Sequence, residues 1–127
     1  MAKRTGGQPA GAKPGDSAHL PDSGDLIWMS FSPQVGREQA GRRPGLVLSP
    51  RSYNAKVGLC LVCPVTQRAK GYVFEVNLPE GLPIQGVVLA DHVKSVDWQG
   101  RKSEWIASAP DEVLDEVRAK LKPLLGT

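Results

Sequence analysis

The sequence from Gly24 to Pro50, GDLIWMSFSPQVGREQAGRRPGLVLSP, constrains the fold more than any other part of the chain. Two runs rich in β-forming residues, Leu26–Phe31 and Gly45–Ser49, enclose the charged, glycine-rich cluster GREQAGRRP. Short apolar runs separated by glycines and closed by a proline are typical of two strands joined by a loop. We therefore expect strand, loop, strand, with Arg43 held at a strand end because Pro44 fixes its own φ there.

The rest of the chain predicts a small, mainly β domain. Runs rich in β-branched and aromatic residues alternate with turn residues such as Asn54, Gly71 and Gly100. Further strands are expected at Gly58–Val65, Tyr72–Leu78, Gly86–Ala90, and near Lys94–Trp98 and Glu104–Ala107. Short strands at this spacing favour a small antiparallel barrel.

One helix is expected at the end of the chain, from about Ser108–Pro110 to Lys122. Apolar residues recur there at helical spacing, at Val113, Leu114, Val117 and Leu121. Acidic residues gather toward its start and basic residues toward its end, which complements the helix dipole. Pro123 should end or kink the helix, after which Leu124 and Leu125 can still pack.

Residues 1–23 differ sharply in composition from the rest of the chain. They are rich in Gly, Pro, Ala and Ser and contain hardly any large apolar side chain. Such a segment cannot offset its ordering entropy by burial, so we expect a disordered tail or an expression extension. His19 lies within it and is therefore a poor catalytic candidate. No apolar run approaches the roughly 20 residues of a membrane span, and no secretory signal is visible, so we expect a cytoplasmic protein.

Basic residues are concentrated in one part of the chain. The net charge is only +3, but residues 37–70 contain seven basic residues against one acid, Glu38, a formal charge of +6. Such a surface attracts phosphate backbones. Scattered Arg and Lys also form ordinary solvated faces, so charge alone leaves both interpretations open.

Cys60 and Cys63 form a C-x-x-C string. In a strand, residues three apart point to opposite faces, so the two sulfurs should not converge on one metal ion. The chain has no second cysteine pair, and its two histidines do not complete a tetrahedral site. We expect two buried or half-buried free thiols.

Common catalytic arrangements do not fit the sequence. A two-histidine ribonuclease would need His19 and His92 in one cleft, and the first lies in the N-terminal segment. Ser49, Asp91 and His92 can be written as a triad, but no G-x-S-x-G elbow carries the serine. The acids lack metal-ligand spacing, so we expect no metal and no cofactor. Metal-free RNA cleavage fits the remaining residue types, because the substrate supplies its own 2′-OH nucleophile.

The loop Glu38–Pro44, EQAGRRP, resembles a motif of the MazF/PemK toxins of bacterial toxin–antitoxin pairs, which carry Glu-Gln-x-Gly-x-Arg-Pro after a Gly-Asp-hydrophobic strand. The resemblance continues in family order through LVLSP at 46–50, Tyr53-Asn54, CPVT at 63–66, KGYVFEV at 70–76 and LADHVKSVDW at 89–98. It spans about residues 24–126, so a toxin domain is expected at 24–127. It implies an SH3-like antiparallel barrel with a terminal helix, shared with CcdB-type gyrase poisons.

The resemblance also implies an activity, a sequence-specific endoribonuclease that cuts single-stranded RNA such as mRNA without a metal. By its position in the motif, Arg43 would stabilise charge on the scissile phosphate, and a guanidinium suits that task because it presents a planar fork of donors. Thr66 matches the family's threonine at the end of the third strand. Glu38 either accepts the 2′-OH proton or holds the arginine in place.

Further residues are candidates for contacting RNA bases and phosphates. They are Gln39, Arg42, Gln67, Lys70, His92 and Lys94. Trp28, Trp98 and Trp105 are expected in the core or at a dimer interface. For His92, the sequence slightly favours a surface histidine without a role over a part in base preference.

Two other functional classes stay open from the sequence: a non-catalytic, CcdB-like toxin that inhibits gyrase, and an RNA-binding barrel without turnover. The joint presence of GREQAGRRP and CPVT favours the nuclease, because a gyrase poison acts mainly through its C-terminal helix. By resemblance, the protein is a homodimer whose groove is blocked by the acidic C-terminal segment of a MazE-like antitoxin.

Overall fold

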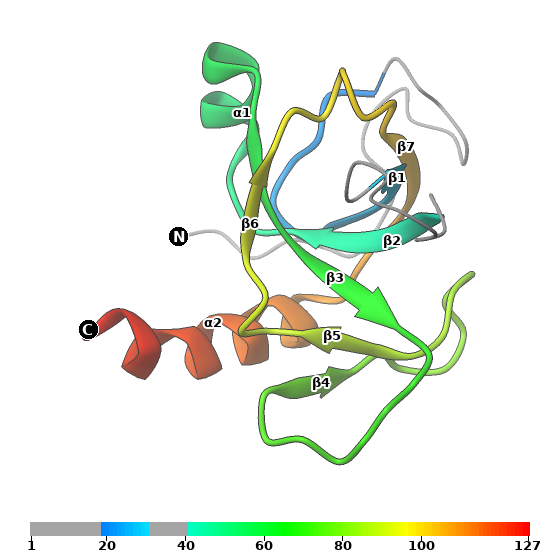
Figure 1. Ribbon diagram of the computed structural model, residues 1–127, viewed down its shortest axis with the longest axis vertical. Helices are drawn as coiled ribbons and strands as arrows, with labels where there is room; N and C mark the ends of the chain where they lie inside the picture. Colours follow the sequence, from blue (N-terminus) through cyan, green and yellow to red (C-terminus); the bar gives the residue numbers. More distant parts are fainter. Residues whose placement is uncertain (1–18, 31–40) are drawn as a thin grey trace, which may run out of the picture.

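The computed structural model describes residues 19–30 and 41–127, which form a coiled antiparallel sheet with one long helix packed across it (Figure 1). In chain order the elements are β1 (Asp25–Ser30), β2 (Arg42–Val47), α1 (Arg51–Val57), β3 (Cys60–Thr66), β4 (Glu75–Asn77), β5 (Val87–Leu89), β6 (Lys94–Val96), β7 (Glu104–Ser108) and α2 (Asp111–Leu125). The predicted class, mainly β with a C-terminal helix, is confirmed.

Every strand pairing within the described residues is antiparallel, and β3 pairs with three other strands, β2, β5 and β6. The order is β4-β5-β3-β2-β1-β7, and β6 pairs with the first half of β3. Cys60–Val62 pair with β6, whereas Val65 and Thr66 pair with β5. Within the described residues these pairings do not link β4 to β7, so the barrel predicted from the sequence is not closed by hydrogen bonds.

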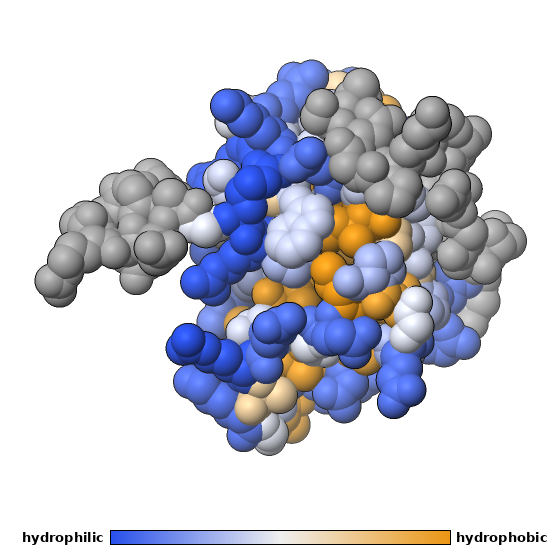
Figure 2. Space-filling model, turned by 90° about the vertical axis from the view of Figure 1, so that its right-hand side faces the viewer, coloured by the Kyte–Doolittle hydropathy of each residue, from blue (hydrophilic) through white to orange (hydrophobic). Residues whose placement is uncertain are grey.

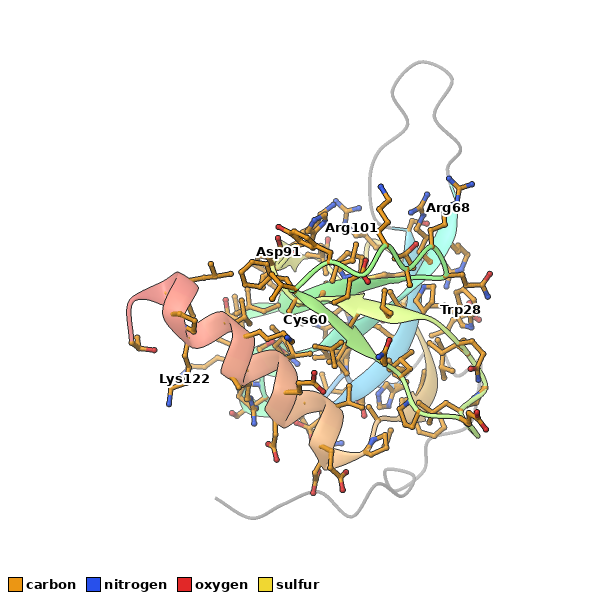
Figure 3. The ribbon with its side chains drawn as sticks, turned by 90° about the horizontal axis from the view of Figure 1, so that it is seen from below. Trp28, Cys60, Arg68, Asp91, Arg101 and Lys122 are labelled. Atoms are coloured by element: carbon orange, nitrogen blue, oxygen red, sulfur yellow. The ribbon has the colours of Figure 1, made fainter. Side chains whose placement is uncertain are left out.

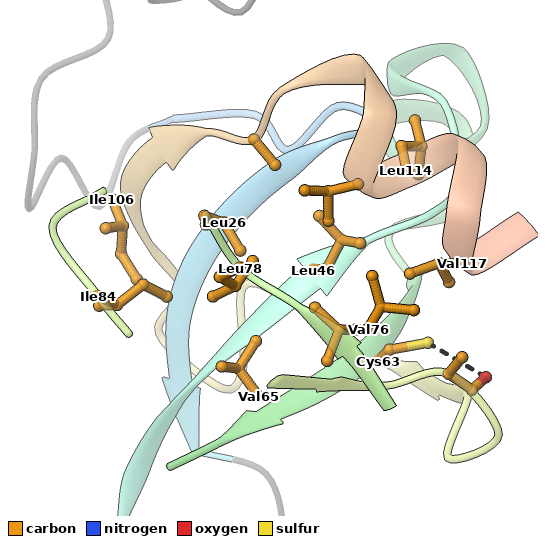
Figure 4. Close-up of a cluster of buried hydrophobic side chains, with 14 of the residues drawn as sticks. Leu26, Leu46, Cys63, Val65, Val76, Leu78, Ile84, Ile106, Leu114 and Val117 are labelled. Atoms are coloured by element: carbon orange, nitrogen blue, oxygen red, sulfur yellow. Dashed lines mark hydrogen bonds between the residues drawn. The ribbon is translucent and has the colours of Figure 1, made fainter. Parts of the chain in front are cut away.

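The core is divided between the two faces of the sheet. One cluster contains Cys63, Val65 and the buried side of α2, and Figure 4 shows these side chains between the strands and the helix. The other cluster contains Cys60, Val62 and Trp98. The prediction that the two cysteines point to opposite faces is confirmed, and both are free and buried.

Helix α2 begins close to its predicted start, after Pro110, but it ends later than predicted. The buried side chains are Val113, Leu114, Val117 and Leu121, as the spacing indicates. Pro123 does not end the helix at Lys122, because it lies in the last turn, where its missing N–H costs only one intrahelical bond. The helix stops at Gly126, whose φ of 76° turns its N–H to the carbonyls of Lys122 and Pro123. Leu124 and Leu125 are exposed, contrary to the expected packing.

Helix α1 is not predicted from the sequence, where Asn54 is interpreted as a turn residue. The Asn54 side chain is fully buried and donates to the carbonyls of Pro21 and Ser49, while its carbonyl side-chain oxygen accepts from the Ser49 hydroxyl. Gly58, with φ of 80°, ends the helix. A buried amide with its hydrogen bonds satisfied fixes α1 against the strands.

Residues 19–23 pack against the sheet, so the part of the expected tail that the structure describes is ordered. His19 is buried, and its Nε2 lies 2.7 Å from Oδ2 of Asp25, also buried. The His19 ring lies 6.0 Å from that of Trp105. Residues 1–18 lie outside the described part of the chain. No helix among the described residues is long and apolar enough to cross a membrane.

Candidate functional site

The register of β2 and β3 brings Arg43 and Thr66 together. Gly45 pairs with Pro64, and the same register extended by two residues places Arg43 opposite Thr66. Both residues line a cavity of about 640 Å³, which we call the first cavity. Its other lining residues are Trp28, Pro44, Val65, Gln67, Arg68, Pro83, Ile84 and Gln85.

The first cavity combines an apolar floor with a polar rim. Figure 2 faces this side of the molecule and shows apolar surface exposed within a border of hydrophilic residues. Val65 and Ile84 provide buried apolar floor, whereas Arg68 and Gln67 are exposed. An anion bound over such a floor is partly shielded from water, which strengthens its attraction to a guanidinium.

Arg43 and its neighbour Arg42 have different environments. The Nη2 atom of Arg42 lies 2.6 Å from Oε1 of Glu104 and donates to the Lys102 carbonyl at 2.7 Å. Within residues 19–30 and 41–127, Arg43 has no carboxylate within 4.0 Å and is exposed at the cavity. Of the two adjacent arginines, Arg43 is therefore the one whose donors can serve a bound phosphate.

Thr66 is held so that its hydroxyl can still donate. The backbone N–H of Arg68 donates to Oγ1 of Thr66 at 3.1 Å, which leaves the hydroxyl proton for another acceptor. The backbone of Thr66 pairs with Val87 on β5. A phosphate oxygen in the first cavity is a suitable acceptor for this proton.

Gly86 permits the close approach of β5 to Thr66, which the sequence does not predict. Its φ is 126°, and a Cβ there would overlap the Thr66 carbonyl oxygen and lie 2.9 Å from the carbonyl carbon. Only glycine fits a positive φ with such a contact. Gly86 thus positions Thr66 without contacting the cavity's contents.

The three tryptophans are not equivalent. Trp98 and Trp105 are buried in the core, as predicted. Trp28 packs against the core but also lines the first cavity next to Arg43. Figure 3 shows Trp28 and Arg68 toward the same end of the molecule, away from Lys122 on α2. A partly exposed indole at this place offers a stacking surface to a nucleobase.

A second cavity, of about 680 Å³, lies beside the first and shares Thr66 and Arg68 with it. Its remaining lining residues are Lys70, Gly71, Tyr72, Glu75, Leu89 and His92. Two of the predicted RNA-contacting residues, Lys70 and His92, therefore meet at one hollow. They come from the β3–β4 loop and the turn after β5.

The other predicted site residues are distributed differently. Gln67 lines the first cavity. Arg42 lines a separate hollow with Glu104, and Lys94 lies on β6 opposite Val62; neither residue lines the two cavities next to Thr66. Glu38 and Gln39 lie outside the described residues.

The buried thiols stay protonated at neutral pH. Burial raises the pKa of both Cys60 and Cys63 to about 12, and the Asp91 carboxylate adds to the effect at Cys63. A thiol with such a pKa is a poor nucleophile and a poor metal ligand. The cysteines therefore serve packing, not chemistry.

Comparisons with known proteins agree with this geometry. Residues 22–125 match the family described as PemK-like, MazF-like toxin of type II toxin-antitoxin system. The chain is similar to Endoribonuclease toxin MazF of Escherichia coli strain K12, with 48% identity over 110 residues, which cover 87% of this chain and 98% of that protein. It is also similar to Endoribonuclease toxin ChpB of the same strain, with 36% identity over 82% of this chain and 93% of that protein. A crystal structure of MazE-MazF from Deinococcus radiodurans superposes with a TM-score of 0.81 and 59% identity, over 86% of this chain and 98% of that chain.

Proposed function

The chain belongs to the PemK-like, MazF-like toxins of type II toxin–antitoxin systems, and we propose that it is a metal-independent endoribonuclease that cleaves single-stranded RNA at specific sequences. The observation that carries the proposal is the meeting of Arg43 and Thr66 at one cavity, with the guanidinium not paired to any described carboxylate. The two relatives from Escherichia coli are named endoribonuclease toxins, which supports the same reaction.

In the proposed mechanism, the 2′-OH next to the scissile phosphate attacks the phosphorus atom as it loses its proton. The bond from phosphorus to the 5′-oxygen breaks, and the leaving 5′-oxygen takes a proton from water or from Arg43. Negative charge builds on the phosphorane oxygens, where the planar donors of Arg43 stabilise it. The Thr66 hydroxyl donates to a further phosphate oxygen. A guanidinium is an awkward general base. The 2′-OH proton therefore goes to another group, and Glu38 is the nearest acid in the sequence; its alternative role is to hold Arg43.

Sequence specificity would come from the surfaces on either side of Thr66. The RNA backbone is attracted by the basic residues at the rim, including Arg68 and Lys70, and the bases meet the aromatic and polar residues of the two cavities. Gln67 in the first cavity and His92 in the second can read base edges. Cleavage of mRNA by such a sequence-specific nuclease would arrest growth.

We further propose that the protein is a homodimer in the cytoplasm, controlled by an antitoxin with an acidic C-terminal segment. A solved relative was crystallised as MazE-MazF. In this chain residues 37–70 carry a formal charge of +6, so the surface that attracts RNA also attracts a carboxylate-rich peptide. The antitoxin segment and RNA should therefore compete.

One experiment separates this function from a gyrase-binding toxin and from an RNA-binding barrel without turnover. Purified protein is incubated with a long single-stranded RNA in EDTA, and new 5′ ends are mapped. We expect cleavage at a short recurring sequence. Arg43→Ala should lower kcat/KM by roughly 10²- to 10³-fold, the loss seen when one well-placed transition-state donor is removed. Arg43→Lys should also lose most activity, because a point charge does not reproduce the fork.

The matched control is Lys122→Ala, which removes an exposed basic residue from α2, outside both cavities and outside the basic stretch 37–70. It should cleave as the parent does. Cleavage by Arg43→Ala within a few-fold of the parent, at equal thermal stability, would refute the assignment of Arg43. Activity that is lost in EDTA and restored by magnesium would refute the metal-free mechanism.

A further inference from the structure

The loop between β3 and β4 is shaped by Glu75. Its carboxylate accepts hydrogen bonds from the backbone N–H of Lys70, at 2.9 Å to Oε2, and of Gly71, at 3.1 Å to Oε1. Gly71 has a φ of 74°, which lets the chain turn there. The loop is therefore held closed by charge-assisted bonds before any ligand arrives, and the wall that it gives the second cavity is preformed.

Tyr72 comes directly after this turn and lines the second cavity with half of its surface exposed. The residue is 49% exposed, yet the position of its side chain is fixed by two contacts. The hydroxyl donates to Oδ2 of Asp91 at 3.1 Å, and its ring lies 5.5 Å from that of Phe74, tilted by 60°. An exposed aromatic ring held in one orientation loses little further entropy when a flat ligand stacks on it.

The rest of the second cavity suits a flat heterocycle that is part of an anionic chain. Leu89 and the ring of His92 add apolar and aromatic surface, and Arg68 and Lys70 add positive charge. Asp91 is near both aromatic walls: its Oδ2 accepts from Tyr72, whereas its Oδ1 lies 3.7 Å from Nε2 of His92 and has no hydrogen-bond partner among the described residues. Single-stranded RNA is bound by such a combination of stacking surfaces and cations.

We propose that the second cavity binds a single nucleobase of the RNA, adjacent to the scissile phosphate, and that Tyr72 is the ring on which this base stacks. The inference rests on the proposed function for the location of the phosphate. Thr66 and Arg68 line both cavities, so a phosphate held between Arg43 and Thr66 places a neighbouring base in the second cavity. Tyr72 is then a residue that touches the substrate and holds this base in place by stacking.

The test is an abasic scan combined with a substitution at Tyr72. A cleaved oligonucleotide is prepared as a series in which one nucleobase at a time is removed, and kcat/KM is measured for the parent protein, Tyr72→Ala and Tyr72→Phe. Loss of one base stack is expected to cost roughly 5- to 150-fold. Removing the base at one position next to the cut should lower kcat/KM of the parent protein by this factor. Tyr72→Ala should lower kcat/KM on the intact RNA by the same factor. For the Tyr72→Ala protein, removing the base at that position should then lower kcat/KM by a further factor of less than about 2.

Tyr72→Phe keeps the ring but removes the hydroxyl. Removing the base next to the cut should therefore lower its kcat/KM as it does for the parent. Tyr53→Ala is the matched control, because it removes a tyrosine of similar exposure, 39%, from α1, outside the second cavity. Its abasic profile should equal that of the parent. Tyr72→Ala that acts equally on every abasic substrate, or that cleaves intact RNA within 2-fold of the parent while folded, would overturn the proposal.

Binding is measured in parallel, so that the proposed base site and the proposed nuclease activity can be refuted independently of each other. Kd is determined on the same oligonucleotides carrying one 2′-deoxyribose at the cut, or on the intact RNA if none is cut. If removing the base at one position weakens binding by the parent protein but not by Tyr72→Ala, the base site is supported even without cleavage. Cleavage that depends on Arg43, without such coupling in either measurement, upholds the nuclease and refutes the base site.

Discussion

Replacing Gly86 by alanine should damage catalysis although the residue contacts neither RNA nor Arg43. The new Cβ would overlap the Thr66 carbonyl oxygen, and the carbonyl carbon would have to retreat from 2.9 Å to an ordinary contact of 3.4 Å or more. The displaced strand end carries Thr66 away from its place opposite Arg43. A misplacement of about 1 Å can cost about 10²-fold, so we expect kcat/KM to fall roughly 10- to 100-fold.

The same substitution also strains the backbone, because Gly86 has a φ of 126°. That strain should lower the free energy of unfolding by about 1–3 kcal/mol. Chemical denaturation measures this loss, and the kinetic assay is run well below the unfolding transition. The loss of stability caused by backbone strain is thereby separated from the loss of activity caused by the displacement of Thr66.

Gly58→Ala is the matched control for backbone strain alone. Gly58 has a φ of 80°, but no atom lies within 4 Å of a Cβ placed there. The variant should lose about 1–2 kcal/mol of stability and keep the parental kcat/KM. If folded Gly86→Ala cleaves RNA within 2-fold of the parent, or if Gly58→Ala loses as much activity, then Gly86 does not position Thr66.

The site and the core lead to three further predictions. Thr66→Ala should lower kcat/KM by roughly 10²-fold while Thr66→Ser, which keeps the hydroxyl, recovers most of it; equal losses in both would refute the donor role. Because burial raises the pKa of Cys60 and Cys63 from 9.0 to about 12, the unfolded state releases these protons first and the unfolding free energy should fall as pH rises from 9 toward 12. That fall, measured by denaturant titration, should be smaller in the Cys60→Ala/Cys63→Ala variant, and an unchanged slope would contradict the assignment. Lys70→Glu should weaken the binding of RNA and of an acidic antitoxin peptide together, with a smaller salt dependence for RNA; loss of only one of the two would show that they do not share this surface.

The hydrophobic pattern is enough to predict the class of fold and the strands near the site. β1 and β2 are expected because apolar runs flank a polar loop, and α2 because its buried residues recur at helical spacing. The strand expected at Tyr72–Leu78 is shorter, Glu75–Asn77, because its partner β5 offers only three residues to pair with. The length of a strand depends on a partner that is distant in the sequence, so the local hydrophobic pattern does not predict it.

The site is only partly predictable for a similar reason. The motifs EQAGRRP and CPVT predict the pair Arg43 and Thr66, and the register of β2 and β3 explains why residues 23 positions apart in the sequence meet. The contacts that refine the site are non-local. Gly86 matters through its approach to the Thr66 carbonyl, and Trp28 through a hollow at the end of β1. Neither the alternation of a strand nor the presence of a glycine indicates such neighbours.

The chemistry at the phosphate is tested most directly with an oligonucleotide that contains the cleaved sequence and one 2′-deoxyribose on the 5′ side of the cut. The reaction is run in EDTA, and the ends of the products from the all-ribose control are identified by mass spectrometry. We predict that the single deoxyribose stops cleavage, and that the control yields a 2′,3′-cyclic phosphate or its 3′-phosphate product together with a free 5′-OH. Cleavage of the deoxyribose substrate at the parental rate, or products with a 5′-phosphate and a 3′-OH, would contradict attack by the 2′-OH in the cavity of Arg43 and Thr66.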